Sequence, residues 1–159
     1  MLNYLIDLFF IGFPIWFRAN ELKIKKPLNP KKFIEILHSF GLTKIDAFDL
    51  IKKTIILLVK LFLALFIIGL ISNYLGLNDS EIISDKIQSI MAEGPFILAY
   101  LVIVRVICEE IFFRGFLLHK LGNFFQAFLF AILHYSYESN IEVIGAFFLG
   151  LILGKSAKD

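Results

Sequence analysis

The chain has 159 residues, of which 58% are hydrophobic and only 19% are charged, and 19 of them are phenylalanine. A soluble domain of this length hides about 70% of the surface of its unfolded chain, which is too little to cover so much apolar area. The composition therefore predicts an all-α integral membrane protein and excludes a disordered chain and a free nucleic-acid-binding protein. A secreted disulfide scaffold is excluded as well, because Cys108 is the only cysteine.

Five stretches are expected to cross the bilayer, whose core takes roughly 20 mostly apolar residues per helix. The first is interrupted by Asp7 and Pro14 and lacks the features of a cleaved signal peptide. A turn at Gly122 separates the third from the fourth, and Asn140 is the expected N-cap of the fifth. The predicted spans comprise residues 2–17, 50–71, 95–119, 123–137 and 140–154.

Two further stretches, residues 31–40 and 78–91, carry apolar side chains at helical spacing opposite charged ones. We expect both to lie on the membrane surface. The chain then divides near residue 48. Residues 1–48 hold the first membrane helix and a basic loop with its interfacial helix, and residues 49–159 form the membrane domain that carries the site.

The distribution of basic residues predicts the orientation in the membrane. Nine lysines and arginines lie between Arg18 and Lys53, whereas Lys86 is the single basic residue of 72–94. Because basic loops stay in the cytoplasm, residues 18–53 are expected inside and residues 72–94 outside, with the N-terminus also outside. The sequence thus predicts a multi-pass protein of the cell membrane.

The third predicted span contains four charged residues, Arg105, Glu109, Glu110 and Arg114. Ionisable groups inside a span are costly and usually mark a functional site. Arg105–Glu109 and Glu110–Arg114 are both i,i+4 pairs, so the alternative is that the four charges only neutralise one another. The Glu-before-Arg order gives the stronger pair. We therefore expect Arg114 to hold Glu110, and Glu109 to be the freer carboxylate.

His134 lies in the fourth predicted span, where a lone histidine is usually a packing residue. The predicted hairpin favours a different role, because Glu109 and His134 lie at equal distances from its turn. Each is about 18 Å of helix rise away, which puts both at one depth. The same hairpin places Arg105 opposite Glu138. A carboxylate and an imidazole at one level suit the shared activation of a water molecule, and loss of solvent makes Glu109 a stronger base.

A divalent metal bridging Glu109 and His134 is the alternative chemistry. A catalytic zinc usually has three protein ligands, and the chain has no His-Glu-x-x-His motif. We therefore predict no metal and no other cofactor.

The sequence Glu109-Glu110-Ile-Phe-Phe-Arg114, followed on the next predicted helix by Phe130-x-x-x-His134, resembles the first two motifs of a known family. These are the type II CAAX prenyl endopeptidases, also called CAAX proteases and bacteriocin-processing enzymes. The resemblance implies that Glu109 and His134 activate a water for peptide hydrolysis within the membrane, and that Glu110 and Arg114 support the site. It also implies two kinds of partner: the membrane lipid, and a peptide or a prenylated protein as the substrate.

The resemblance covers residues 94–154 and does not include the family's later His-x-x-x-Asn motif, which helps to bind the oxyanion. Residues 119–123 have the sequence of that motif, but they lie on both sides of the predicted turn. For this reason we treat this match as chance. We therefore expect a C-terminally truncated membrane domain that holds half or more of an active site, completed by a missing segment, a partner chain or a second copy. The alternatives to a peptidase are a catalytically inactive membrane-binding or bacteriocin-immunity-like protein and, more distantly, a proton-relay or transport subunit.

Overall fold

The computed structural model describes residues 2–23, 29–40, 46–77, 80–135 and 139–158, and all regular structure in these ranges is helical. A single long helix from Pro95 onward comprises α5, η1, α6 and η2, where η1 and η2 are turns of π-helix. In chain order, the elements are α1 (Leu2–Glu21), α2 (Pro30–Ser39), α3 (Ala47–Tyr74), α4 (Ser80–Ala92), α5 (Pro95–Ala99), η1 (Tyr100–Arg105), α6 (Val106–Glu109), η2 (Glu110–Leu117), α7 (Leu118–His134) and α8 (Asn140–Ser156).

These helices confirm the predicted all-α class, and each stretch expected to be helical contains one. Helix α3 is the one helix in the described ranges that is both long and apolar enough to cross a membrane, with a mean hydropathy of 2.9. None of its side chains is buried, and large apolar ones such as Phe62 and Phe66 are more than half exposed. The number of spans, five, therefore stays a prediction.

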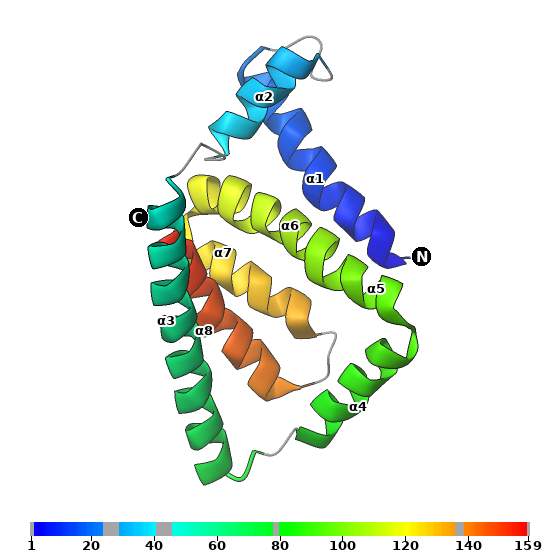
Figure 1. Ribbon diagram of the computed structural model, residues 1–159, viewed down its shortest axis with the longest axis vertical. Coiled ribbons are helices and arrows are strands. Elements are labelled where there is room, and N and C mark those ends of the chain that lie inside the picture. The colour runs from blue at the N-terminus through cyan, green and yellow to red at the C-terminus, as the bar shows by residue number, and fades with distance from the viewer. Residues whose placement is uncertain (1, 24–28, 41–45, 78–79, 136–138, 159) are drawn as a thin grey trace.

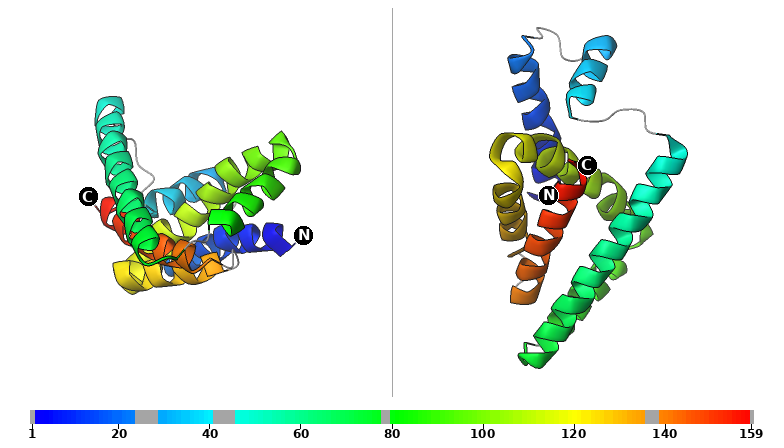
Figure 2. Two further views of the ribbon diagram at one scale, coloured as in Figure 1. Left: turned by 90° about the horizontal axis from the view of Figure 1, so that it is seen from below. Right: turned by 90° about the vertical axis from the view of Figure 1, so that its left-hand side faces the viewer.

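The long helix from α5 to η2 crosses the middle of the molecule (Figure 1). Helix α1 packs along one side of it, and α7 folds back along the other. Helix α8 packs against α7, and α3 packs against α8 at the edge of the molecule (Figure 2). The predicted hairpin is thus present, with α7 lying between η2 and α8.

The core of this arrangement is aromatic and centres on η2. Phe10 of α1 stacks on Phe112 with ring centres 4.6 Å apart, and Phe113 meets Phe130 of α7 edge to face at 5.1 Å. Phe113 is almost completely buried. Each buried aromatic ring removes a large apolar area from solvent. These contacts fix η2 between α1 and α7.

The turn of the hairpin lies at Gly122, as the sequence predicted. Its φ of 80° is in the left-handed region, which glycine adopts without the steric cost of a Cβ. The side chain of the neighbouring Asn123 forms two hydrogen bonds. Its Nδ2 donates to the Leu151 carbonyl at 2.9 Å, and its Oδ1 accepts from Gln126 Nε2. Asn123 thus joins α7 to α8.

Helix α8 begins with a different cap from the one predicted. The Ser139 side chain accepts the backbone N–H of Glu142 at 3.1 Å, so Ser139 and not Asn140 is the N-cap. The prediction was wrong by one residue because both residue types are good caps. The small face at Gly150 and Gly154 packs against α7, where Gln126 Nε2 donates to the Gly150 carbonyl at 2.7 Å.

Polar contacts attach α1 to the rest of the molecule at both of its ends. Near the start, the Tyr100 hydroxyl donates to Oδ2 of the buried Asp7 at 2.6 Å. At the other end, Glu21 forms ion pairs with Lys120 and Arg18. Hydrogen bonding to Lys120 holds the pKa of Glu21 below its usual range.

Helix α2 forms where an interfacial helix was expected, but part of its apolar face packs on protein. Ile36 is completely buried and Phe40 nearly so, with Phe40 against Gly115 of η2. Ile34 is exposed. This segment therefore closes the end of the α1–η2 interface.

Candidate active site

The four charged residues of the long helix form the two ion pairs that their spacing predicted. Arg105 Nε lies 3.2 Å from Glu109 Oε1, and Arg114 Nη1 lies 3.2 Å from Glu110 Oε1. The Arg105–Glu109 contact also has hydrogen-bond geometry. The sequence argument expected Glu109 to be the freer carboxylate, but its side chain is 20% exposed and that of Glu110 is 45% exposed.

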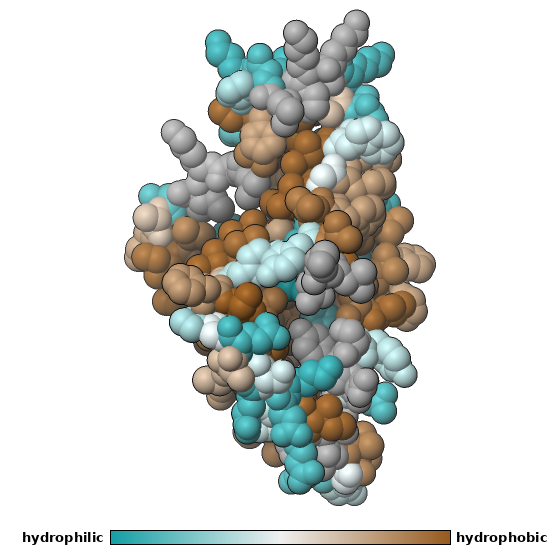
Figure 3. Space-filling view, turned by 90° about the vertical axis from the view of Figure 1, so that its right-hand side faces the viewer, coloured by the Kyte–Doolittle hydropathy of each residue, from teal (hydrophilic) through white to brown (hydrophobic). Residues whose placement is uncertain are grey.

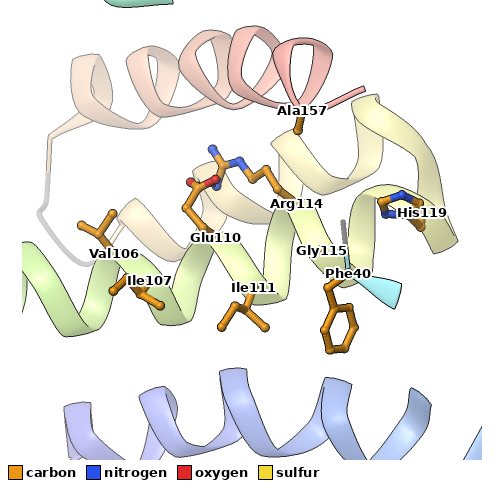
Figure 4. Close-up of a pocket in the computed structure, with 9 residues that line it drawn as sticks. All are labelled: Phe40, Val106, Ile107, Glu110, Ile111, Arg114, Gly115, His119 and Ala157. Atoms are coloured by element: carbon orange, nitrogen blue, oxygen red, sulfur yellow. Dashed lines mark ion pairs between the residues drawn. The ribbon is translucent and has the colours of Figure 1, made fainter. Parts of the chain in front are cut away.

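Glu110 lines a cavity of about 450 Å³. Its polar lining consists of Glu110, Arg114 and His119. Figure 4 shows the charged ends of Glu110 and Arg114 together, on the side of the helix nearest Ala157. The apolar lining includes Phe40, Val106, Ile107, Ile111 and Ala157. Because Glu110 and Arg114 belong to η2, this cavity lies beside a π-helical turn, a rare geometry often found at functional sites.

Arg114 lines this cavity and is 5% exposed. Its guanidinium carbon lies 4.4 Å from the centre of the Phe130 ring and 5.9 Å from that of Phe113. None of its three side-chain nitrogens makes a hydrogen bond with the described part of the chain. The cation is therefore held by the Glu110 carboxylate and by aromatic faces.

His134 ends α7, with its Nδ1 2.8 Å from the Phe130 carbonyl oxygen. A carbonyl can only accept, so Nδ1 is the protonated nitrogen. Nε2 of the neutral ring is then a proton acceptor, which is what a general base requires. His134 lines a second, largely apolar cavity of about 440 Å³, together with Glu142 of α8.

Phe130 lies between these two groups and contacts both. Its ring centre is 4.4 Å from the Arg114 guanidinium carbon and 4.4 Å from the centre of the His134 ring. Phe130 also lines the second cavity. Phe130, the first residue of the second motif, thus contacts both Arg114 of the first motif and His134. The sequence argument assigned no role to its ring.

The two residues expected to share a water molecule make their described contacts elsewhere. Glu109 accepts a hydrogen bond from Arg105, and His134 is hydrogen-bonded to the Phe130 carbonyl. The water-activating pair of Glu109 and His134 therefore stays a prediction. Glu138, the predicted partner of Arg105, lies outside the described residues.

The sequence argument missed two polar groups near these residues. Asp7 was noted only as an interruption, although an ionisable residue within a predicted span already marks a position of interest. The Asp7 carboxylate accepts a hydrogen bond from the hydroxyl of Tyr100, and Tyr100 lies about one turn before Arg105 in the long helix. Glu142 of α8 lines the same cavity as His134, and nothing in the sequence pattern indicated this.

A metal site was the alternative chemistry for Glu109 and His134. Within the ranges that the structure describes, no three or more His, Cys, Asp or Glu side chains are grouped so that they could hold a metal ion. The lone cysteine, Cys108, is buried and has no disulfide partner.

Comparison with known proteins identifies the region that carries the motifs. Residues 92–157 match the family model described as type II CAAX prenyl endopeptidase Rce1-like. No curated protein and no solved structure matches the chain. The matched range contains both ion pairs, the cavity residue Arg114 and His134. This match confirms, for residues 92–157, the resemblance to the type II CAAX prenyl endopeptidases seen in the sequence.

Proposed function

We propose that this protein is an intramembrane endopeptidase of the CAAX-protease type. In this proposal, a water activated by Glu109 and His134 hydrolyses a peptide bond near the C-terminus of a lipidated or membrane-bound substrate. The observation that carries the proposal is the family match over residues 92–157, which contain both residues. The hydrogen bond of His134 to the Phe130 carbonyl supports it, because Nε2 is left as a proton acceptor.

The chemistry follows from the groups present. The water oxygen attacks the carbonyl carbon of the scissile amide while the Glu109–His134 pair takes up its proton. The tetrahedral intermediate then collapses, and the same pair returns the proton to the departing amine. Arg105 holds the Glu109 carboxylate by a hydrogen bond and an ion pair, which fixes its direction. Glu110, the next residue, and Arg114, about one turn later, form the second ion pair and support the site.

We place the protein in the cell membrane as a multi-pass protein, with the N-terminus outside and residues 18–53 in the cytoplasm. The exposed apolar side chains of α3 support this placement. On the face drawn in Figure 3, apolar side chains fill the middle and hydrophilic ones gather toward the two ends. Such a band is the distribution that a bilayer requires.

Purified protein in nonionic detergent, supplied with a helical peptide that bears His-x-x-x-Asn and given a prenylated peptide that ends in a CAAX sequence, tests the proposal. Glu109→Gln should lower the cleavage rate by about 10²–10⁴-fold, the usual contribution of acid–base catalysis. The amount of protein in the membrane fraction should be unchanged, because the amide keeps nearly the shape of the carboxylate. His134→Gln should have a similar effect on the rate.

Glu35→Gln is the matched control, because Glu35 forms an exposed ion pair with Lys32 on α2, away from both cavities. It should cleave at the wild-type rate. A fully active Glu109→Gln variant would contradict the catalytic assignment. Failure of the wild-type protein to cleave the prenylated peptide even when a helix bearing His-x-x-x-Asn is supplied would contradict the peptidase itself, and would favour a catalytically inactive membrane-binding protein.

A further inference from the structure

His134 shares its cavity with a carboxylate, that of Glu142 in α8. Among the described residues that line this cavity of about 440 Å³, these two are the polar ones. The others come from α3, α4, α7 and α8, and all of them are apolar or glycine. Charges in such surroundings are weakly screened by solvent, so an imidazole and a carboxylate that share them affect each other strongly.

The other charges around this pair come from α4 and η2. The Glu142 carboxylate interacts electrostatically with His134 and with Lys86 of α4. Arg114 of η2 contacts the Phe130 ring, which also contacts His134, but this arginine is paired with its own glutamate. Helix α3 contributes no charged residue to the lining. Among the described residues that line the cavity, Glu142 is therefore the anion that acts on His134.

Two hydrogen bonds hold the pair from within its own helices. The Ser139 side chain accepts the backbone N–H of Glu142 at 3.1 Å, which fixes the first turn of α8. His134 Nδ1 donates to the Phe130 carbonyl at 2.8 Å, so Nε2 is the nitrogen that can take a proton from water. The ring is then an imidazolium, and a cation is costly in a largely apolar cavity unless an anion shares it.

We propose that the Glu142 carboxylate stabilises the imidazolium that His134 forms when it takes a proton from the attacking water. This proposal rests on the proposed function and adds to it a residue outside both motifs. Glu142 acts through His134, so it is a positioning residue and not a catalytic one.

The proton and the electron pairs balance without a further reactant. The proton that leaves the water goes to His134 Nε2, and the electron pair of the broken O–H bond forms the new C–O bond. When the C–N bond of the substrate breaks, Nε2 returns the proton to the departing amine nitrogen. Glu142 stays a carboxylate throughout and only offsets the positive charge of the ring.

The protonation of His134 can be measured without any cleavage. Full-length protein with isotope-labelled histidine, in nonionic detergent, gives imidazole signals in a nuclear magnetic resonance spectrum, and the His134 signal is the one that His134→Gln lacks. At pH of about 6.5, where histidine ordinarily titrates, the signal reports the ratio of imidazolium to neutral ring. Glu142→Gln should lower this ratio by at least about threefold, because the cation loses its anion.

Glu81→Gln is the matched control, because Glu81 also lies in the first turn of its helix, α4, but is exposed and does not line the cavity. It should leave the ratio unchanged. Glu142→Asp keeps the charge on a shorter side chain and should restore the ratio to within about twofold of the wild-type value.

Cleavage of the prenylated peptide, with the helix bearing His-x-x-x-Asn supplied, gives the second readout. Glu142→Gln should lower kcat about tenfold and change KM by less than about twofold, because the carboxylate acts on a charge that exists only during the reaction. Glu142→Asp should cleave within about threefold of the wild-type rate.

An unchanged imidazolium ratio in Glu142→Gln would overturn the inference, and so would an equal fall in Glu81→Gln. Equal losses in Glu142→Gln and Glu142→Asp would assign Glu142 to the packing of α8 and would overturn it as well. A wild-type kcat in Glu142→Gln would overturn the positioning role even if the ratio falls. Failure of the proposed function is distinguishable, because the wild-type protein then cleaves nothing, whereas the ratio still shows whether Glu142 stabilises the His134 cation.

Discussion

The guanidinium carbon of Arg114 lies 4.4 Å from the centre of the Phe130 ring. A desolvated cation–π contact of this kind stabilises a structure by up to about 2 kcal/mol. The Phe130 ring also contacts His134, whose ring centre lies 4.4 Å away. The Phe130 ring of α7 therefore positions both the Arg114 guanidinium of η2 and the His134 imidazole at the end of α7.

Phe130→Leu should impair both folding and cleavage. Leucine fills much of the space but has no π face, so we expect the free energy of unfolding to fall by about 2 kcal/mol, mainly from loss of the contact with Arg114. Cleavage should fall by at least about tenfold, because His134 loses a wall that fixes its ring. Phe128→Leu is the control, since Phe128 is on the same helix but 48% exposed, and it should change neither. Thermal unfolding in detergent and the peptide assay measure the two effects, and wild-type behaviour of Phe130→Leu would refute the bridging role.

Arg114→Ala should reduce the amount of folded protein as well as its activity. It leaves Glu110 without its cation beside a largely apolar cavity, and breaking a buried ion pair typically costs about 3–5 kcal/mol. Glu110 is 45% exposed, so the loss should lie at or below the lower end of that range. Lys32→Ala removes an exposed pair on α2 and should cost less than about 1 kcal/mol. The measurement is the amount of each variant in the membrane fraction. Equal amounts of Arg114→Ala and Lys32→Ala would show that the Arg114–Glu110 pair contributes nothing to stability.

The helices could be predicted from the sequence because each depends on local pattern. The turn at Gly122, the start at Pro95 and the two i,i+4 ion pairs follow from residue types a few positions apart, and the structure contains all of them. Their ends were less predictable, as the cap at Ser139 illustrates.

The arrangement of the candidate site depends on contacts between helices, which periodicity does not encode. Nothing in the spacing of Asp7 and Tyr100 shows that they meet, since 93 residues separate them. The order of charges predicted Glu109 to be the freer carboxylate, whereas Glu109 is hydrogen-bonded to Arg105 and Glu110 has the more exposed side chain. Whether a side chain lies at a cavity mouth is decided by how its helix is rotated against its neighbours, and here π-helical turns alter that rotation.

Gly154→Ala should destabilise the α7–α8 interface. A Cβ at this position would lie 2.5 Å from Gln126 Nε2 and would also overlap Asn123 Oδ1. The two side chains would have to give up hydrogen bonds to α8, so we expect a loss of about 1–3 kcal/mol. Gly145→Ala on the same helix meets nothing within 4 Å and should be neutral or stabilise by up to about 1 kcal/mol, because alanine is the better helix former. If the two variants unfold at the same temperature, the close approach of α7 at Gly154 does not contribute to the free energy of unfolding.

Cysteine accessibility should reveal the orientation in the membrane. Cys108 is buried, so a cysteine introduced at Lys31 or Asp85, both exposed, should dominate the labelling. An impermeant maleimide added to intact cells should label Asp85→Cys, and should label Lys31→Cys only after the membrane is opened. The reason is the concentration of basic residues around Lys31. Equal labelling of both from outside would contradict the predicted topology.

Tyr100→Phe should destabilise the attachment of α1 to the long helix. The change removes the hydroxyl that donates to Asp7 Oδ2 at 2.6 Å, and Asp7 is only 4% exposed with no described hydrogen bond to its other oxygen. Leaving a buried acceptor without its donor typically costs about 1–3 kcal/mol. Tyr4→Phe is the control, because the Tyr4 ring packs on Tyr100 at 5.0 Å but is 46% exposed, and its loss of a hydroxyl should cost less than about 0.5 kcal/mol.

Adding Asp7→Leu to Tyr100→Phe distinguishes the hydrogen bond from the general packing of the site. Replacing both partners by apolar groups removes the unsatisfied carboxyl, so the double variant should be more stable than Tyr100→Phe alone. Unfolding temperatures of the two single variants, the double variant and the wild type form a double-mutant cycle, and neighbours in contact should show a coupling of at least about 0.5 kcal/mol. Additive effects would mean that Asp7 and Tyr100 contribute independently, and that the contact between them does not hold α1 in place.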